Sequence, residues 1–219
     1  LEGMGYARGR LQLIVADDET GVLEALDMKP PKAEFVPANF AAMPEKRTTL
    51  RLALDHLQAQ APHAKQIIPL PAGAPFGEIK VNRATCTLCM ACVGVCPASA
   101  LSDGADLPQL IFREGNCVQC GLCEAACPED AITLAPRFVC DPKLRQQTRI
   151  LNEQQPFCCV VCGKPFATRA MMDRMSEKLK DHWMFQSPEA VRRLQMCEDC
   201  RVKDMFGRAG GLADAYRKP

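Results

Sequence analysis

The feature that most constrains this chain is a cysteine motif that occurs twice. The pattern C-x2-C-x2-C-x3-C-P runs from Cys86 to Pro97 and again from Cys117 to Pro128. Each set continues with a small or acidic pair, then Ala and a branched apolar residue, in "ASAL" and "EDAI". Matched cysteines are offset by 31 residues throughout, so the block is an internal duplication.

The spacing within each set suits a 4Fe-4S cubane. Three cysteines at this spacing wind the backbone around one corner of the cluster, so that three thiolates face three irons and amides turn toward sulfur. In a duplicated unit the fourth cysteine, which stands directly before the proline, reaches the other cluster. The predicted ligand sets are Cys86, Cys89, Cys92 and Cys127 for the first cluster, and Cys117, Cys120, Cys123 and Cys96 for the second.

Two alternatives stand beside this interpretation. Zinc is also held by four cysteine thiolates, although its sites usually come as two separated C-x2-C pairs. A pair of clusters can also brace a fold without carrying electrons. Apolar residues between the ligands would exclude water and tune potentials, which for iron-sulfur centres span roughly −700 to +450 mV.

Residues 79–136 resemble a bacterial-type ferredoxin domain with two 4Fe-4S clusters. The stretches "EIKVNRATC" and "LIFREGNC" match the short strands before each cluster in that family, and "AITLAPR" matches its closing strand. The loop "SDGADLP" is longer than in the smallest members. The resemblance implies one-electron transfer between two neighbouring clusters of low potential.

Composition narrows the other possibilities. The 219 residues include 14 cysteines without an export signal, which favours metal ligands in a reducing cytoplasm over disulfides. A net charge of +1 creates no general attraction for nucleic acid or anionic lipid, and no apolar run is long enough for a membrane span. Because the chain opens at Leu1, we expect a piece or processed form of a longer protein.

Residues 1–77 are predicted to form a small α/β unit, incomplete by itself, that ends in a Pro- and Gly-rich linker at 69–77. Asp17 and Asp18 resemble the acidic pocket of a response-regulator receiver domain, but the segment is too short for that fold. A helix start capped by Asp18 or Thr20 is the simpler explanation. The predicted strands are 11–16, 33–38 and 66–70, and the predicted helices are 21–28 and 46–60, with Leu50, Leu54 and Leu57 as a buried stripe.

The tail carries a second cysteine pattern, two C-x2-C pairs formed by Cys159, Cys162, Cys197 and Cys200. Gly163 allows a knuckle after the first pair, and the second pair opens a helix-like run. The arrangement resembles a treble-clef or zinc-ribbon site, so one Zn²⁺ is predicted, with a rubredoxin-like iron or a third cluster as alternatives.

Other tail residues have ordinary interpretations. The helix-like segment 167–185 places Met171, Met175, Leu179 and His182 near one face, which is typical of core packing, and His182 as a ligand is the less favoured interpretation. Cys140 and Cys158 are expected to be ordinary thiols.

The predicted fold is α+β, with a small α/β unit at 1–77, a two-cluster ferredoxin-like domain at 78–138 and a helical metal-knuckle tail at 139–219. The predicted function is electron transfer between a cytoplasmic oxidoreductase, for example one like formate dehydrogenase, and another carrier. A redox-sensing or nucleic-acid-binding regulator with a zinc finger is the alternative, based on Arg192, Arg193, Arg201 and Lys203. An enzyme that acts alone is the third possibility, but the sequence contains no glycine-rich nucleotide-binding fingerprint to support it.

Overall fold

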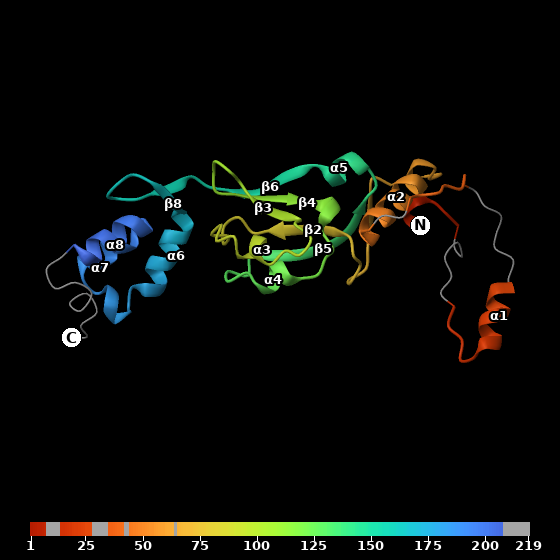
Figure 1. Ribbon diagram of the computed structural model, residues 1–219, viewed down its shortest axis with the longest axis horizontal. Helices are drawn as coiled ribbons and strands as arrows, with labels where there is room; N and C mark the ends of the chain where they lie inside the picture. The colour runs from red at the N-terminus through yellow and green to blue at the C-terminus, as the bar shows by residue number, and fades with distance from the viewer. Residues whose placement is uncertain (8–13, 28–34, 42–43, 64, 208–219) are drawn as a thin grey trace. The chain divides into compact units, whose positions relative to one another are not determined.

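The computed structural model describes residues 1–7, 14–27, 35–41, 44–63 and 65–207. These residues form helices and small antiparallel sheets, as expected for an α+β chain (Figure 1). The chain divides into two compact units. The first contains residues 1–72 and 137–145, and the second contains residues 73–136 and 146–219.

The first unit combines helices with one small strand pairing. Strand β1 (Ile67–Pro69) pairs antiparallel with residues 137–139 at the end of β5 (Ile132–Val139). Its helical elements are η1 (Glu2–Met4), α1 (Glu19–Asp27), α2 (Lys46–Ala59) and α5 (Pro142–Gln146).

Polar contacts join these elements. Arg145, which is buried, pairs with Asp55 of α2, and its guanidinium lies 4.6 Å from the ring centroid of Phe138. The Tyr6 hydroxyl donates a 2.6 Å hydrogen bond to the carbonyl of Leu57.

Both expected helices of this unit are present, but the described parts of two expected strands do not form strands. Residues 14–16 and 35–38 form no strand, and the rest of those two predicted segments lies outside the described residues. Val15 is 83% exposed and Val36 is 70% exposed, because neither segment has a neighbouring strand on which to bury an apolar face. Asp18 caps α1 as predicted, accepting a 2.8 Å hydrogen bond from the Gly21 amide.

Helix α2 differs from its predicted packing. Leu50 is 42% exposed, and no residue of the helix is fully buried within the described part of the chain. Leu54 and Leu57 are only partly buried, so the predicted buried stripe of three leucines is wrong. In the predicted linker at 69–77, residues 70–76 are irregular and turn at Gly73 with φ +83°, whereas Pro69 and Gly77 belong to strands.

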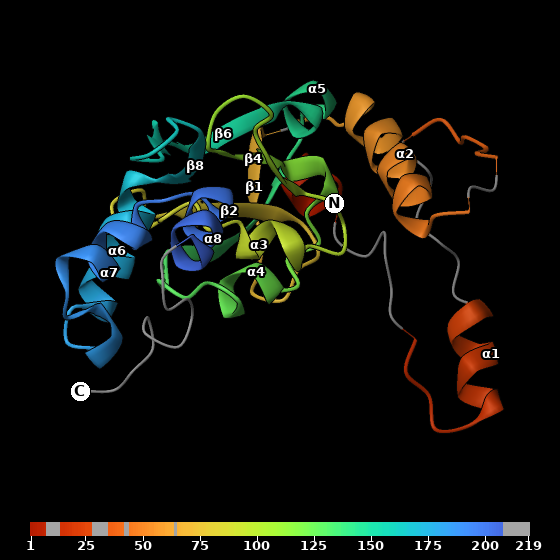
Figure 2. The ribbon, with the colours of Figure 1, turned by 60° about the vertical axis from the view of Figure 1, so that its left-hand side comes forward.

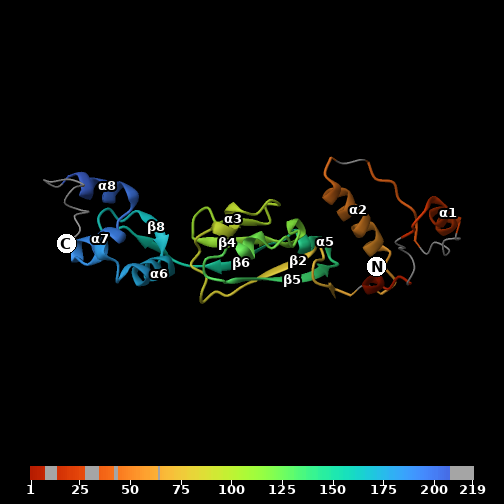
Figure 3. The ribbon, with the colours of Figure 1, turned by 90° about the horizontal axis from the view of Figure 1, so that it is seen from below.

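The second unit contains the duplicated motif between strands (Figures 2 and 3). Strand β2 (Gly77–Val81) pairs antiparallel with the first part of β5, and β3 (Leu101–Asp103), β4 (Gln109–Arg113) and β6 (Thr148–Glu153) form a second sheet. The short helices α3 (Ala91–Gly94) and α4 (Leu122–Ala125) each contain the third cysteine of a motif and lie next to each other. A single turn, η2 (Glu114–Asn116), precedes the second motif.

Strand β6 was not predicted. Its sequence reads as polar, and Asn152 is the one buried residue of the strand. The Asn152 side-chain amide donates a 3.3 Å hydrogen bond to the carbonyl of Cys86, and Arg83 donates a 2.7 Å bond to the carbonyl of Leu151. A segment assigned to the tail thus adds an edge strand beside the first motif.

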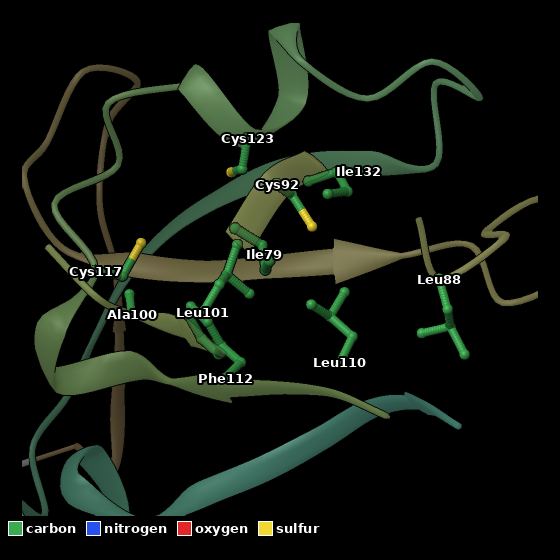
Figure 4. Packing of buried hydrophobic residues seen from close by; sticks show 10 residues of the cluster. All are labelled: Ile79, Leu88, Cys92, Ala100, Leu101, Leu110, Phe112, Cys117, Cys123 and Ile132. Atoms are coloured by element: carbon green, nitrogen blue, oxygen red, sulfur yellow. The ribbon is translucent and has the colours of Figure 1, made fainter. Parts of the chain in front are cut away.

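The core of this unit lies between the two sheets and the cysteine loops. Leu110 and Phe112 alternate inward along β4 and are each 1% exposed. Figure 4 shows Ile79 and Leu101 packed among these side chains, with the thiols of Cys92, Cys117 and Cys123 directed into the same interior. The cysteine loops are therefore part of the hydrophobic core.

The tail begins with a hairpin of β7 (Pro156–Cys158) and β8 (Pro165–Thr168), followed by helices α6 (Arg169–Leu179), α7 (Pro188–Leu194) and α8 (Glu198–Phe206) and the turn η3 (Trp183–Phe185). Thr168 and Ser187 cap α6 and α7 through their hydroxyls. Met172 is the buried methionine of α6, whereas the predicted Met171 and Met175 are only partly buried.

Candidate metal centres

The two cysteine motifs have the same backbone conformation. Leu88 and Gln119 occupy matched positions and have φ values of 56° and 54°. Met90 and Gly121, also matched, are left-handed caps of α3 and α4. Left-handed conformations are costly for residues other than glycine, so their recurrence at matched positions indicates that the surrounding structure requires them.

Thiols from both motifs line each of two cavities. The first cavity is lined by Cys86, Cys89 and Cys92 from the first motif and by Cys127 from the second. The second cavity is lined by Cys117, Cys120 and Cys123 from the second motif and by Cys96 from the first. The remaining lining is mainly apolar and includes Leu110 and Ile132 in the first cavity, and Ile79, Leu101 and Phe112 in the second.

Backbone amides point at the sulfur of each fourth cysteine. The Ala100 amide lies 3.3 Å from Cys96 Sγ, and the matched Ala131 amide lies 3.3 Å from Cys127 Sγ. In the second cavity the side-chain Nε2 of Gln119 lies 3.3 Å from Cys117 Sγ. Donors of this kind stabilise thiolate and the negative charge of a bound cluster.

The buried thiols of these cavities resist ionisation. Burial, followed by the neighbouring Cys86 and Cys89, raises the pKa of Cys92 to about 12. Burial and the neighbouring Cys117 raise the pKa of Cys123 to about 11. Four crowded thiolates in an apolar cavity need a cationic centre to compensate them, so the donor set fits an iron cluster.

Charged and polar side chains surround the first cavity. Glu129 lines it and pairs with Arg174 at 2.8 Å and Lys178 at 3.7 Å, both on α6. The buried hydroxyl of Thr168 donates a 2.8 Å hydrogen bond to the carbonyl of Thr87. Sequence reasoning missed these residues because their partners are far away along the chain.

The four tail cysteines form one cluster. The Sγ atoms of Cys159, Cys162, Cys197 and Cys200 all lie within 4.8 Å of one another. Gly163 has φ +75° and its amide donates to the carbonyl of Cys159, which closes the predicted knuckle. Cys197 is the N-cap of α8 and Cys200 lies in the first turn of that helix. A tetrad of this geometry can hold one tetrahedral ion.

The thiols of the tetrad differ in acidity. Burial opposes ionisation of Cys159, but amide donors from Cys162, Cys197 and Val161 outweigh it and lower the pKa of Cys159 to about 6. The Cys162 side chain, with burial, raises the pKa of Cys200 to about 12.

Cys140, Cys158 and His182 lie outside the tail tetrad. Cys158 is exposed and does not belong to the tetrad, and Cys140 is buried, which raises its pKa. His182 is exposed and accepts a hydrogen bond from the Met184 amide at the start of η3. The structure therefore does not bring His182 to the tail cluster.

Comparison with known protein families identifies the duplicated cysteine block. Residues 85–132 match the model of the family described as 4Fe-4S dicluster domain. The match includes both cysteine motifs and the strands β3 and β4 between them. No curated protein matches the chain. In the described part of the chain, every helix is too short or too polar to cross a membrane.

Proposed function

We propose that this chain, which contains a ferredoxin-like 4Fe-4S dicluster domain followed by a four-cysteine tail, passes single electrons between redox proteins through two neighbouring clusters. The observation that carries the proposal is the pair of four-thiol cavities inside one hydrophobic core. Bound there, a 4Fe-4S cluster supplies a centre that gains and loses one electron. The chain's own residues hold it, shield it and adjust its charge.

The ligands are proposed to be crossed between the motifs. Cys127 lines the cavity of the first motif and Cys96 that of the second, which supports four-thiolate sets of mixed origin. The sets are Cys86, Cys89, Cys92 and Cys127, and Cys117, Cys120, Cys123 and Cys96. Crossing makes each cluster depend on both halves of the fold, so loading one half without the other is unfavourable.

Electron exchange with partners is proposed to occur at the exposed ligands. Cys89 and Cys120 are exposed, whereas Cys92 and Cys123 are buried. Cys89 also borders a groove of about 590 Å³ whose walls include the loop from Asp103 to Pro108 and strand β8. This open side gives a redox partner short access to the first cluster, while the buried thiols keep water from the rest.

The partner is proposed to be a larger oxidoreductase in a reducing cytoplasm, with a formate dehydrogenase-like assembly as one example. The support is the role that such dicluster domains usually have, together with flanking segments that a free carrier would not require. The chain itself is proposed to be an electron-transfer component.

The tail is proposed to hold one structural Zn²⁺. A closed tetrad of thiols between a hairpin and a helix suits zinc, and its binding energy would stabilise a segment with a small core. Iron in the same tetrad is the alternative. A nucleic-acid-binding role has less support, because Arg193 pairs with Asp204, and Arg201 donates to the carbonyls of Arg193, Leu194 and Met196.

The test is metal analysis of anaerobically purified protein combined with a reductive titration. We expect about eight iron and eight sulfide per chain, and two one-electron reduction steps with dithionite. We also expect about one zinc, which is assigned by its loss on Cys200→Ser. A preparation that contains zinc alone and no sulfide would contradict the electron-transfer proposal.

A further inference from the structure

The two halves of the duplication carry different side chains at a matched position that lines the cavity of each half. Leu88 and Gln119 lie two residues after the first cysteine of their motifs, share a left-handed backbone, and line the first and second cavity respectively. The leucine is 5% exposed and brings only apolar surface to its cavity. The glutamine brings a hydrogen-bond donor.

The orientation of the Gln119 amide follows from its second contact. Nε2 lies 3.0 Å from the backbone carbonyl oxygen of Glu78 and 3.3 Å from Cys117 Sγ. A carbonyl oxygen only accepts hydrogen bonds, so the group facing Glu78 must be the NH₂. One hydrogen of this NH₂ is directed to Glu78, and the other remains for the sulfur.

The surrounding structure is built to hold this amide. Gly77 lies against it, and a Cβ at position 77 would stand 2.6 Å from Gln119 Cδ. Gln119 Oε1 is buried and has no hydrogen-bond partner among the described residues. Burying that oxygen is costly, and a leucine here would avoid the cost, so the contact with sulfur is what the glutamine adds.

We propose that Gln119 raises the reduction potential of the cluster in the second cavity, so that this cluster is reduced before the one in the first cavity. The inference rests on the proposed function. An added electron makes the cluster and its thiolates more negative by one unit. A donor at Cys117 Sγ stabilises that reduced form more than the oxidised form.

Other differences between the cavities act in both directions. Glu129 lines the first cavity, where its carboxylate disfavours reduction of the cluster, and Arg174 and Lys178 compensate that charge. The matched residue in the second cavity is the uncharged Ala98. Cys86 is partly exposed whereas Cys117 is buried, which favours reduction of the first cluster. The contribution of Gln119 must therefore be measured by changing that residue alone.

The experiment compares Gln119→Leu with the matched control Leu88→Met. Leucine already occupies the equivalent left-handed position in the first half, so Gln119→Leu introduces the side chain that the duplicate carries. Leu88→Met exchanges one apolar side chain for another beside the first cavity and removes no donor. Iron and sulfide are counted in each variant before an EPR-monitored redox titration.

We expect Gln119→Leu to lower the higher-potential step, and we expect Leu88→Met, which removes no donor from the second cavity, to leave that step where it is. A tenfold decrease in the reduced-to-oxidised ratio at fixed potential corresponds to about 59 mV for a one-electron couple. A fully loaded Gln119→Leu protein with unchanged steps, or with a shift of the lower step, would overturn the inference. Gln119→Met, which keeps an unbranched side chain, repeats the measurement if leucine reduces loading. If the unaltered protein contained no iron and sulfide, that result would instead contradict the proposed function.

Discussion

Thr168 joins the tail to the first cysteine motif, because its buried hydroxyl donates a 2.8 Å hydrogen bond to the carbonyl of Thr87. The same oxygen accepts a 3.1 Å hydrogen bond from the Met171 amide as the N-cap of α6. One hydroxyl therefore stabilises both the start of a tail helix and the loop between Cys86 and Cys89.

Replacing Thr168 by Val should destabilise the loop around the first cluster. The change removes a cap and leaves a buried carbonyl without its donor, at a cost of about 2 kcal/mol. The first cluster should then lose iron to a chelator faster, while the second cluster changes less. Thr168→Ser keeps the hydroxyl and should behave like the unaltered protein. Equal acceleration at both clusters would contradict a local role.

The ion pair between Arg174 and Glu129 should influence the first cluster. Glu129 is buried except for 10% of its side chain and lines the first cavity, so losing the nearer of its two cations leaves its negative charge less well compensated, with only Lys178 at 3.7 Å. Arg174→Gln should lower the potential of the first cluster in a redox titration at low salt, with a smaller shift at high salt. Arg169→Gln, which removes an exposed pair with Asp173, is the matched control and should shift neither cluster.

The tail metal should be lost without loss of the two clusters. Cys200→Ser removes one member of the tetrad, so the protein should bind about one zinc less and become more sensitive to proteolysis around residues 157–206. The visible spectrum of the clusters should remain. Cys158→Ser, which changes a neighbouring exposed thiol, should keep the zinc. Equal zinc content in both variants would place the zinc elsewhere.

Zinc affinity of the tail should rise with pH. The Cys162 side chain and burial raise the pKa of Cys200 to about 12, so its proton is present at neutral pH and must leave when zinc binds. One released proton strengthens binding by about tenfold for each unit of pH increase. Competition with a chromophoric chelator at pH 6.5, 7.0 and 7.5 measures this slope, and a flat profile would contradict thiol ligation.

The sequence predicted the parts of the molecule that depend on local spacing. Two complete cysteine motifs, the Gly163 knuckle and the Asp18 cap each depend on a few neighbouring residues, and the structure has each of them. The apolar run that includes Val15 also predicts a strand, but its described residues 14–16 form none, because composition alone does not say whether a partner strand is available.

Contacts between residues far apart in the chain could not be predicted from the sequence pattern. Apolar and polar residues alternate only weakly along β6, so its sequence does not predict a strand. Its buried residue, Asn152, bonds to Cys86, which lies 66 residues away in the chain. Thr168 is likewise tied to Thr87 across 81 residues. Gln119 could have been noticed, because aligning the two motifs sets this polar residue against Leu88. The alignment does not reveal the Glu78 carbonyl that orients its amide.

The most direct test of the account is the EPR spectrum of the reduced Cys127→Ala protein, with Cys96→Ala as the reciprocal variant. With crossed ligands, Cys127→Ala should damage the cluster held by Cys86, Cys89 and Cys92, as a three-iron species or a shifted potential. The second cluster should give a simple signal without the broadening that two neighbouring paramagnets cause. If Cys127→Ala instead removes the cluster at Cys117, Cys120 and Cys123, each motif binds its own cluster and the crossed assignment is wrong.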